Sequence, residues 1–108
     1  MPWTVETLNK AVDAEMGTLP VGLRARLVRL MEIIEDHEVT HLREPHAKHL
    51  EGKLWELRAK GGEGIARAIY ITVTGRRVVI LHAFVKKSAK TPAKALRIAR
   101  QRLKELEP

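Results

Sequence analysis

The sequence predicts an α+β protein, because two segments with helical periodicity come first, strand-like segments follow, and one more helix ends the chain. Strands that are gathered between helices, instead of alternating with them, favour a small and mainly antiparallel sheet. The length of 108 residues and the hydrophobic content of 44% suit one compact core. We therefore expect a single domain over residues 1–108, with the element order β-α-α-β-β-β-α.

The N-terminal third predicts one short strand and two helices that pack on the sheet. Residues 3–7 alternate weakly between apolar and polar side chains, as in a strand. Residues 17–20 interrupt the helical pattern, and Pro20 suits the first turn of the second helix. The apolar positions that fit one helical face are Val5, Leu8, Val12 and Met16, then Leu23, Leu27, Leu30, Met31 and Ile34.

Residues 36–52 are polar and rich in histidine, so we expect mainly a connection with at most a helical turn. Within it, residues 37–41 spell the H-E-x-x-H pattern, which on a helix presents two imidazoles to zinc and a glutamate to water. His46 or His49 could supply a third ligand. However, Val39 and Thr40 are β-branched, Pro45 follows closely, and short matches often arise by chance. Zinc binding is therefore the hypothesis that we rank lowest.

Three strands are predicted after this connection. They cover residues 53–58, 65–74 and 78–85, and a flexible glycine-rich loop joins the first two. Gly75, at the first central position of a two-residue turn, would provide the positive φ of a type II′ hairpin. The last strand is apolar on both faces, so we expect it in the interior of the sheet.

The final segment predicts an amphipathic helix. Thr91 is a suitable N-cap, and Pro92 fits the first turn. The apolar positions are Leu96, Ala99, Leu103 and Leu106, and the exposed basic positions are Lys94, Arg97, Arg100, Arg102 and Lys104.

Composition narrows the class of partner. The formal charge of +7 favours an anionic partner, which could be nucleic acid, an acidic protein surface or anionic lipid. The chain has no cysteine, which excludes disulfides and thiolate metal sites and gives no sign of an oxidising compartment. No secretory signal is recognisable, and no window approaches the ~20 apolar residues of a membrane span. We expect a soluble, cytoplasmic protein.

The predicted hairpins bring charged side chains to one face of the sheet. Pairing Thr74 with Arg77 would place Ile71 opposite Ile80, Ile69 opposite His82 and Arg67 opposite Phe84. If the glycine-rich loop pairs Arg58 with Arg67, the shared face collects Glu56, Arg58, Arg67, His82, Phe84 and Lys86. Two adjacent guanidinium groups repel each other unless an anion or Glu56 lies between them. A bound phosphate would satisfy them, and a plain ion pair with Glu56 is the equally simple alternative.

The basic loop after the last strand is a second candidate. Lys86, Lys87 and Lys90 could clamp phosphate groups there. A lysine among other cations, partly withdrawn from water, would also have a lowered pKa that suits acid–base catalysis. A solvated basic loop is the simpler interpretation. Trp3 and Trp55 are interpreted as core residues, because Trp55 alternates away from the charged row.

Three motifs acquire meaning together: Leu-Trp-Glu-Leu-Arg at 54–58, Arg67 with Tyr70, and the 81–92 segment with F-x-K-K and T-P before a basic helix. In combination they resemble the HigB-like, phage-derived branch of the RelE/ParE toxin superfamily. The resemblance is close from residue 50 onward and concerns only the predicted layout before it. It implies a RelE-like fold and the toxin of a type II toxin–antitoxin pair, a ribosome-dependent mRNA endonuclease that needs no cofactor. A helix-turn-helix antitoxin would neutralise it.

Carried over residue by residue, the resemblance implies catalytic roles for Arg58, Arg67 and Lys86. The arginines would clamp the phosphate, and Lys86 would clamp it or transfer a proton. RNA binding or orientation would fall to Lys87, Lys90, His82, Phe84 and Glu56. The chain departs from the better-studied RelE-like pattern because it has no tyrosine or histidine near its C-terminus. The general base therefore stays unassigned.

Two further functions remain open besides the zinc hypothesis. A ParE-like inhibitor of DNA gyrase would share the fold without the nuclease chemistry, and would stall replication while transcripts stay whole. A non-catalytic nucleic-acid-binding phage accessory protein would use the basic helix to contact phosphates, and would bind in a salt-sensitive way without toxicity.

Overall fold

The computed structural model describes residues 2–106 and has the predicted α+β architecture. In chain order its elements are β1 (Thr4–Thr7), α1 (Lys10–Thr18), α2 (Val21–Asp36), the 3₁₀ turn η1 (Val39–His41), β2 (Ala47–Glu51), β3 (Leu54–Gly61), β4 (Gly64–Val73), β5 (Arg77–Lys86) and α3 (Ala93–Leu106). The helices and the three central strands lie where the sequence predicts them. Strand β2 is additional.

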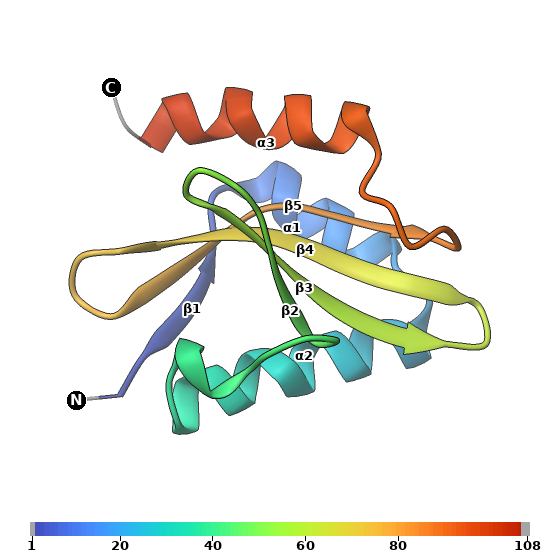
Figure 1. The fold of residues 1–108 in the computed structure, drawn as a ribbon, viewed down its shortest axis with the longest axis horizontal. Coiled ribbons are helices and arrows are strands. Elements are labelled where there is room, and N and C mark those ends of the chain that lie inside the picture. The colour runs from blue at the N-terminus through green and yellow to red at the C-terminus, as the bar shows by residue number, and fades with distance from the viewer. Residues whose placement is uncertain (1, 107–108) are drawn as a thin grey trace.

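The five strands form one sheet in the order β1-β5-β4-β3-β2, in which β1 runs parallel to β5 and every other pair is antiparallel. Helices α2 and α3 lie on opposite sides of this sheet (Figure 1). Strand β5 is interior, as its apolar sequence predicts. Strand β1 pairs only with the first part of β5, from Arg77 to Ile80.

The prediction that residues 36–52 form mainly a connection is wrong at its C-terminal end, where β2 pairs with β3. Strand β2 lies at the edge of the sheet, and its register shifts between His49 and Glu51. Edge strands commonly carry polar and charged side chains, because only one side of their backbone is paired and much of their surface meets water. Lys48 and His49 therefore concealed the strand from a pattern based on alternating hydrophobicity.

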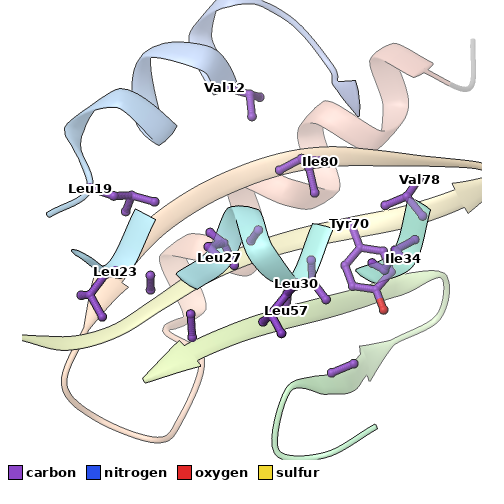
Figure 2. Close-up of a cluster of buried hydrophobic side chains, with 14 residues drawn as sticks. Val12, Leu19, Leu23, Leu27, Leu30, Ile34, Leu57, Tyr70, Val78 and Ile80 are labelled. Atoms are coloured by element: carbon purple, nitrogen blue, oxygen red, sulfur yellow. The ribbon is translucent and has the colours of Figure 1, made fainter. Parts of the chain in front are cut away.

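The larger core lies between the sheet and helices α1 and α2 (Figure 2). Its α2 residues recur every three or four positions, which places them on one helical face. These are Leu23, Leu27, Leu30 and Ile34, and they meet Leu57, Tyr70, Val78 and Ile80 of the sheet, with Val12 contributed by α1. Each fully buried leucine of this kind stabilises the fold by about 1.5–3 kcal/mol.

A smaller core lies on the other face, beneath α3. Ala95 and Ala99 are buried against sheet residues that include Leu54, Ile69 and Leu81. Because side chains alternate along a strand, Leu54 shares this face with Glu56 and Arg58, and Ile69 shares it with Arg67. The charged row predicted from the sequence therefore lies on the side of the sheet that α3 covers.

The turn between β4 and β5 differs from the prediction, but the register beyond it agrees. Val73 pairs with Arg77, so three residues form the turn, and both Gly75 (φ 90°) and Arg76 (φ 57°) have positive φ. The predicted pairing of Ile71 with Ile80 is therefore wrong. A β-bulge then inserts one extra residue, Leu81, into β5. Beyond it, Arg67 lies opposite Phe84 as predicted.

Candidate functional site

The register of the sheet brings two arginines together. Arg58 pairs with Arg67 across β3 and β4, as predicted, and Arg67 pairs on its other side with Phe84 of β5. Glu56 lies two residues before Arg58 on the same face. We refer to Glu56, Arg58 and Arg67 as the arginine row.

Glu56 lies between the two guanidinium groups and is fully buried. Its Oε1 accepts a hydrogen bond from Arg58 Nε at 2.5 Å and lies 3.9 Å from Arg67 Nη1. Its Oε2 accepts a hydrogen bond from the Thr91 hydroxyl at 3.0 Å. The carboxylate of Glu56 thus offsets the repulsion between the two arginines, which is the second of the two possibilities given above. The site is buried, however, and is not a solvated face of the sheet.

Residues 88–91, between β5 and α3, cross over the arginine row, and we call them the strap. Arg58 Nη2 donates to the carbonyl of Ala89 at 2.8 Å, and Arg67 Nη2 donates to the carbonyl of Ser88. Thr91 precedes the first residue of α3 by two positions, so its hydroxyl bonds to Glu56 instead of acting as the predicted N-cap. Three hydrogen bonds from different strap residues therefore hold this segment against the sheet.

Arg67 is fully buried, which is unusual for a charged side chain. Its Nε and Nη1 have no hydrogen-bond acceptor among residues 2–106. Burial lowers the pKa of Arg67, and Glu56 opposes that change by favouring the charged form. Each buried donor without a partner costs about 1–3 kcal/mol. The arrangement is thus rich in donors and short of acceptors, which is the electrostatic requirement for holding an anion.

The lysines of the basic loop are exposed to solvent. Lys86 pairs with Ile65 at the end of β5, on the face of the arginine row, and Lys87 and Lys90 follow it. The structure therefore has the solvated basic loop, the simpler of the two interpretations. Lys86 and Lys87 precede the strap and Lys90 belongs to it, so this segment carries three exposed positive charges.

An open cleft separates β2 from the strap. Its volume is about 420 Å³, and its lining residues are Lys48, His49, Leu50, Arg58, Ala89, Lys90, Thr91 and Leu96. The side chain of Arg58 remains 16% exposed, in contrast to that of Arg67. Among the three members of the arginine row, Arg58 is therefore the one that solvent reaches.

Comparison with known proteins now identifies the family. Residues 14–104 match the family described as "Phage derived protein Gp49-like (DUF891)". The chain belongs to this family. A chain in the crystal structure of the archaeal RelE–RelB complex from Pyrococcus horikoshii OT3 is 27% identical, with a TM-score of 0.59 over 82% of this chain and 100% of that one. The fold of the Gp49-like protein is therefore RelE-like. Among curated proteins, no significant match was found.

His82 of the Gp49-like protein is held by a network that the sequence did not reveal. The residue is only 8% exposed, its Nδ1 donates to Glu15 Oε1 at 2.9 Å, and its ring stacks on Phe84 with centroids 5.1 Å apart. Arg102 of α3 donates to both carboxylate oxygens of Glu15, at 2.9 Å each. Arg102 therefore joins α3 to α1 and does not belong to the exposed basic face on which it was predicted.

Glu15 also binds the unpaired edge of β5. Its Oε1 accepts from the backbone N–H of Ala83 at 3.1 Å, and Arg102 donates to the carbonyl of Leu81 at 2.8 Å. Burial alone would raise the pKa of Glu15, but the hydrogen bonds from Arg102, His82 and Ala83 hold it below its ordinary value. No local pattern marks Glu15, because its role depends on where β1 stops pairing with β5.

Trp55 of the Gp49-like protein is not the core residue that was predicted. It is 39% exposed and lies against His49, with ring centroids 5.0 Å apart. It helps to line a cleft of about 610 Å³ together with Tyr70, Leu42 and other residues of η1, β2 and β4. Trp3, in contrast, packs against the larger core.

The H-E-x-x-H pattern does not lie on an α-helix. Helix α2 ends at Asp36, and the 3₁₀ turn η1 contains only the last residues of the pattern. The rings of His37 and His41 stack with centroids 4.6 Å apart. Across residues 2–106, no group of three or more His, Cys, Asp or Glu side chains is arranged to hold a metal ion. In the same part of the chain, no helix is long and apolar enough to cross a bilayer.

Proposed function

We propose that this Gp49-like protein is the toxin of a type II toxin–antitoxin pair and cleaves mRNA on the translating ribosome, in the manner of the HigB-like branch. The arginine row carries the proposal, because it places two guanidinium groups and a carboxylate at one point of a RelE-like sheet. The family match and the 27% identical chain of the RelE–RelB complex support the class of protein. Because its target would be the translating ribosome, the protein would act in the cytoplasm. A helix-turn-helix antitoxin would neutralise it.

The proposed reaction is an attack within the RNA itself. A general base, which the resemblance leaves unassigned, takes the proton of a 2′-hydroxyl, and the oxygen attacks the adjacent phosphorus. The bond from phosphorus to the 5′-oxygen breaks as the 2′,3′-cyclic phosphate forms, and the 5′-oxygen takes a proton from a general acid. The negative charge of the pentacoordinate phosphorane would be stabilised by Arg58 and Arg67. Lys86 would clamp the phosphate or transfer a proton.

The buried state of Arg67 restricts this proposal to an open form of the site. The strap carbonyls of Ser88 and Ala89 bind the guanidinium donors that a phosphate would use. We therefore interpret the closed arrangement as a resting conformation, in which substrate would have to displace the strap before Arg67 could act. Lys87 precedes the strap, Lys90 belongs to it, and Phe84 pairs with Arg67 on β5. All three would then contact RNA.

Transcript-end mapping after induced expression tests the proposal. The wild-type chain is expected to arrest growth and to generate new mRNA ends that require active translation. K86A removes an exposed side chain and should abolish or strongly reduce cleavage without loss of folding, whereas R67K keeps the charge of Arg67 and changes its geometry. K10Q, at an exposed position of α1, provides the control. Growth arrest with intact transcripts would contradict the proposal.

The second candidate, inhibition of DNA gyrase, is favoured by one observation. Arg67 is inaccessible in the folded chain, and a binder that acts by surface contact has no need of an accessible catalytic group. Growth arrest would then come with DNA damage and stalled replication, and purified chain would inhibit gyrase supercoiling. Salt-dependent nucleic-acid binding with no growth defect would instead identify a non-catalytic binding protein.

A further inference from the structure

The cleft between β2 and the strap has the charge and position of an anion site. Four of its lining residues can carry positive charge, namely Lys48, His49, Arg58 and Lys90, and none of the eight is acidic. Lys48 lies directly opposite Glu56 in the pairing of β2 with β3, so it is on the same face as the arginine row. Nothing in the sequence motifs points to Lys48, because β2 itself was not recognised.

The cleft residue Arg58 lies next to donors that lack a partner. Arg58 lines the cleft, and its Nη2 binds the carbonyl of Ala89. Its partner across β3 and β4 is the fully buried Arg67, whose Nε and Nη1 have no acceptor among residues 2–106. An anion in the cleft would therefore meet Arg58 first, and Arg67 would become accessible only after the strap moves.

We propose that this cleft binds a phosphodiester group of single-stranded RNA through Lys48, Arg58 and Lys90, and that binding releases the strap from Arg58. The inference rests on the proposed function and adds the place where the substrate first binds. A guanidinium bonds more strongly to an ionised phosphate than to a neutral carbonyl, because both partners are then charged and a phosphate can accept two parallel N–H bonds from the guanidinium. Phosphate thus competes with Ala89 for Arg58, and loss of this bond removes one of the three hydrogen bonds that hold the strap.

Binding of a fluorescent 2′-O-methyl oligoribonucleotide tests the inference, because this probe lacks the nucleophilic hydroxyl and is not cleaved. At ~0.1 M salt, K48Q is expected to weaken binding roughly fivefold, and to lower the slope of log K against log salt by about 0.7, the value of one phosphate contact on a single strand. K10Q removes the same charge from α1, which packs along β1 and β5 at the opposite edge of the sheet. It should leave both quantities nearly unchanged.

NMR relaxation of the backbone amides reports on the strap in the same complex. The order parameters of residues 88–91 should fall in the wild-type chain when the oligonucleotide is bound, and this change should be smaller in K48Q at equal saturation. Equal weakening by K48Q and K10Q, or strap order parameters that rise on binding, would overturn the inference.

The outcomes separate this inference from the function on which it rests. If K48Q cleaves transcripts in cells at the wild-type rate and binds the probe normally, the cleft is wrong and the nuclease proposal stands. If the wild-type chain leaves transcripts intact but binds the probe in a Lys48-dependent way, the nuclease proposal is wrong and the cleft stands.

Discussion

Replacing Glu56 by glutamine should destabilise the protein strongly, although the two side chains have nearly the same shape. The amide oxygen of E56Q can still accept the bond from Arg58 Nε, and Thr91 keeps a polar partner, so the substitution removes mainly the negative charge. Arg58 and the fully buried Arg67 would then face each other across β3 and β4 without a counter-ion. Removing one partner of a buried ion pair typically costs about 3–5 kcal/mol, because the other charge stays buried and uncompensated.

We expect a loss of about 3 kcal/mol in the free energy of unfolding, at the lower end of that range because Arg58 is 16% exposed. For a chain of this size, such a loss lowers the melting temperature by roughly 10–20 °C. Urea unfolding followed by circular dichroism measures it, with an unchanged m-value as evidence that both states keep their compactness.

The matched control is E51Q. Glu51 binds Arg100 at 2.6 Å, but both side chains are largely exposed, and exposed pairs contribute little. E51Q should therefore have a far smaller effect than E56Q. If the two variants lost equal stability, Arg67 would have to be hydrated in solution, and the closed position of the strap would be refuted.

Three further predictions concern other parts of the chain. The pKa of Glu15 is lowered from 4.5 on folding. Its contribution to stability is therefore present above pH 4.5 and is lost as the pH falls through the pKa of the folded state. E15Q should flatten the acid limb of a curve of unfolding free energy against pH. Tyr70 is the one tyrosine of the chain, and burial raises its pKa to about 12. Tyrosinate absorbance should therefore appear near pH 12, and the free energy of unfolding should fall between pH ~10 and that value. An absorbance transition near pH ~10 would contradict the burial of Tyr70. L27A should lower the free energy of unfolding in urea by about 2–5 kcal/mol, because Leu27 is fully buried. V28A, at a position that is 38% exposed, should lower it much less. Similar losses in the two variants would mean that a different face of α2 packs on the sheet.

Alternation and turn chemistry were sufficient to predict the central part of the fold and the pairing of Arg58 with Arg67. The predicted pairing of Arg67 with Phe84 also held despite a wrong turn, because the extra residue Leu81 in the bulge shifts the register by one and cancels the error before the site. That compensation depends on the packing of the whole sheet and has no local signature. Strand β2 was missed for a related reason, since an edge strand with polar side chains lacks the alternation that identifies buried strands.

The state of the site was harder to predict than its members. The sequence indicated that an anion or Glu56 must separate the two arginines, and it left both possibilities open. Which one applies depends on the path of residues 88–91, whose backbone carbonyls, present in every residue type, bind the guanidinium groups. Exposure of Trp55 likewise depends on the path of residues 39–49, which leaves an open cleft beside its side chain, and alternation along β3 carries no information about that path.

The network around Glu15 has a consequence for how this protein meets other copies of itself. Beyond Ile80, where β1 stops pairing, β5 would present free backbone groups to which a strand of another molecule could add. Glu15 binds the N–H of Ala83 and Arg102 binds the carbonyl of Leu81, so these two positions offer no hydrogen bond to an incoming strand. Two side chains from helices at opposite ends of the sequence thus protect this edge of the sheet from aggregation. A longer β1 could protect it in the same way, by pairing with the rest of β5.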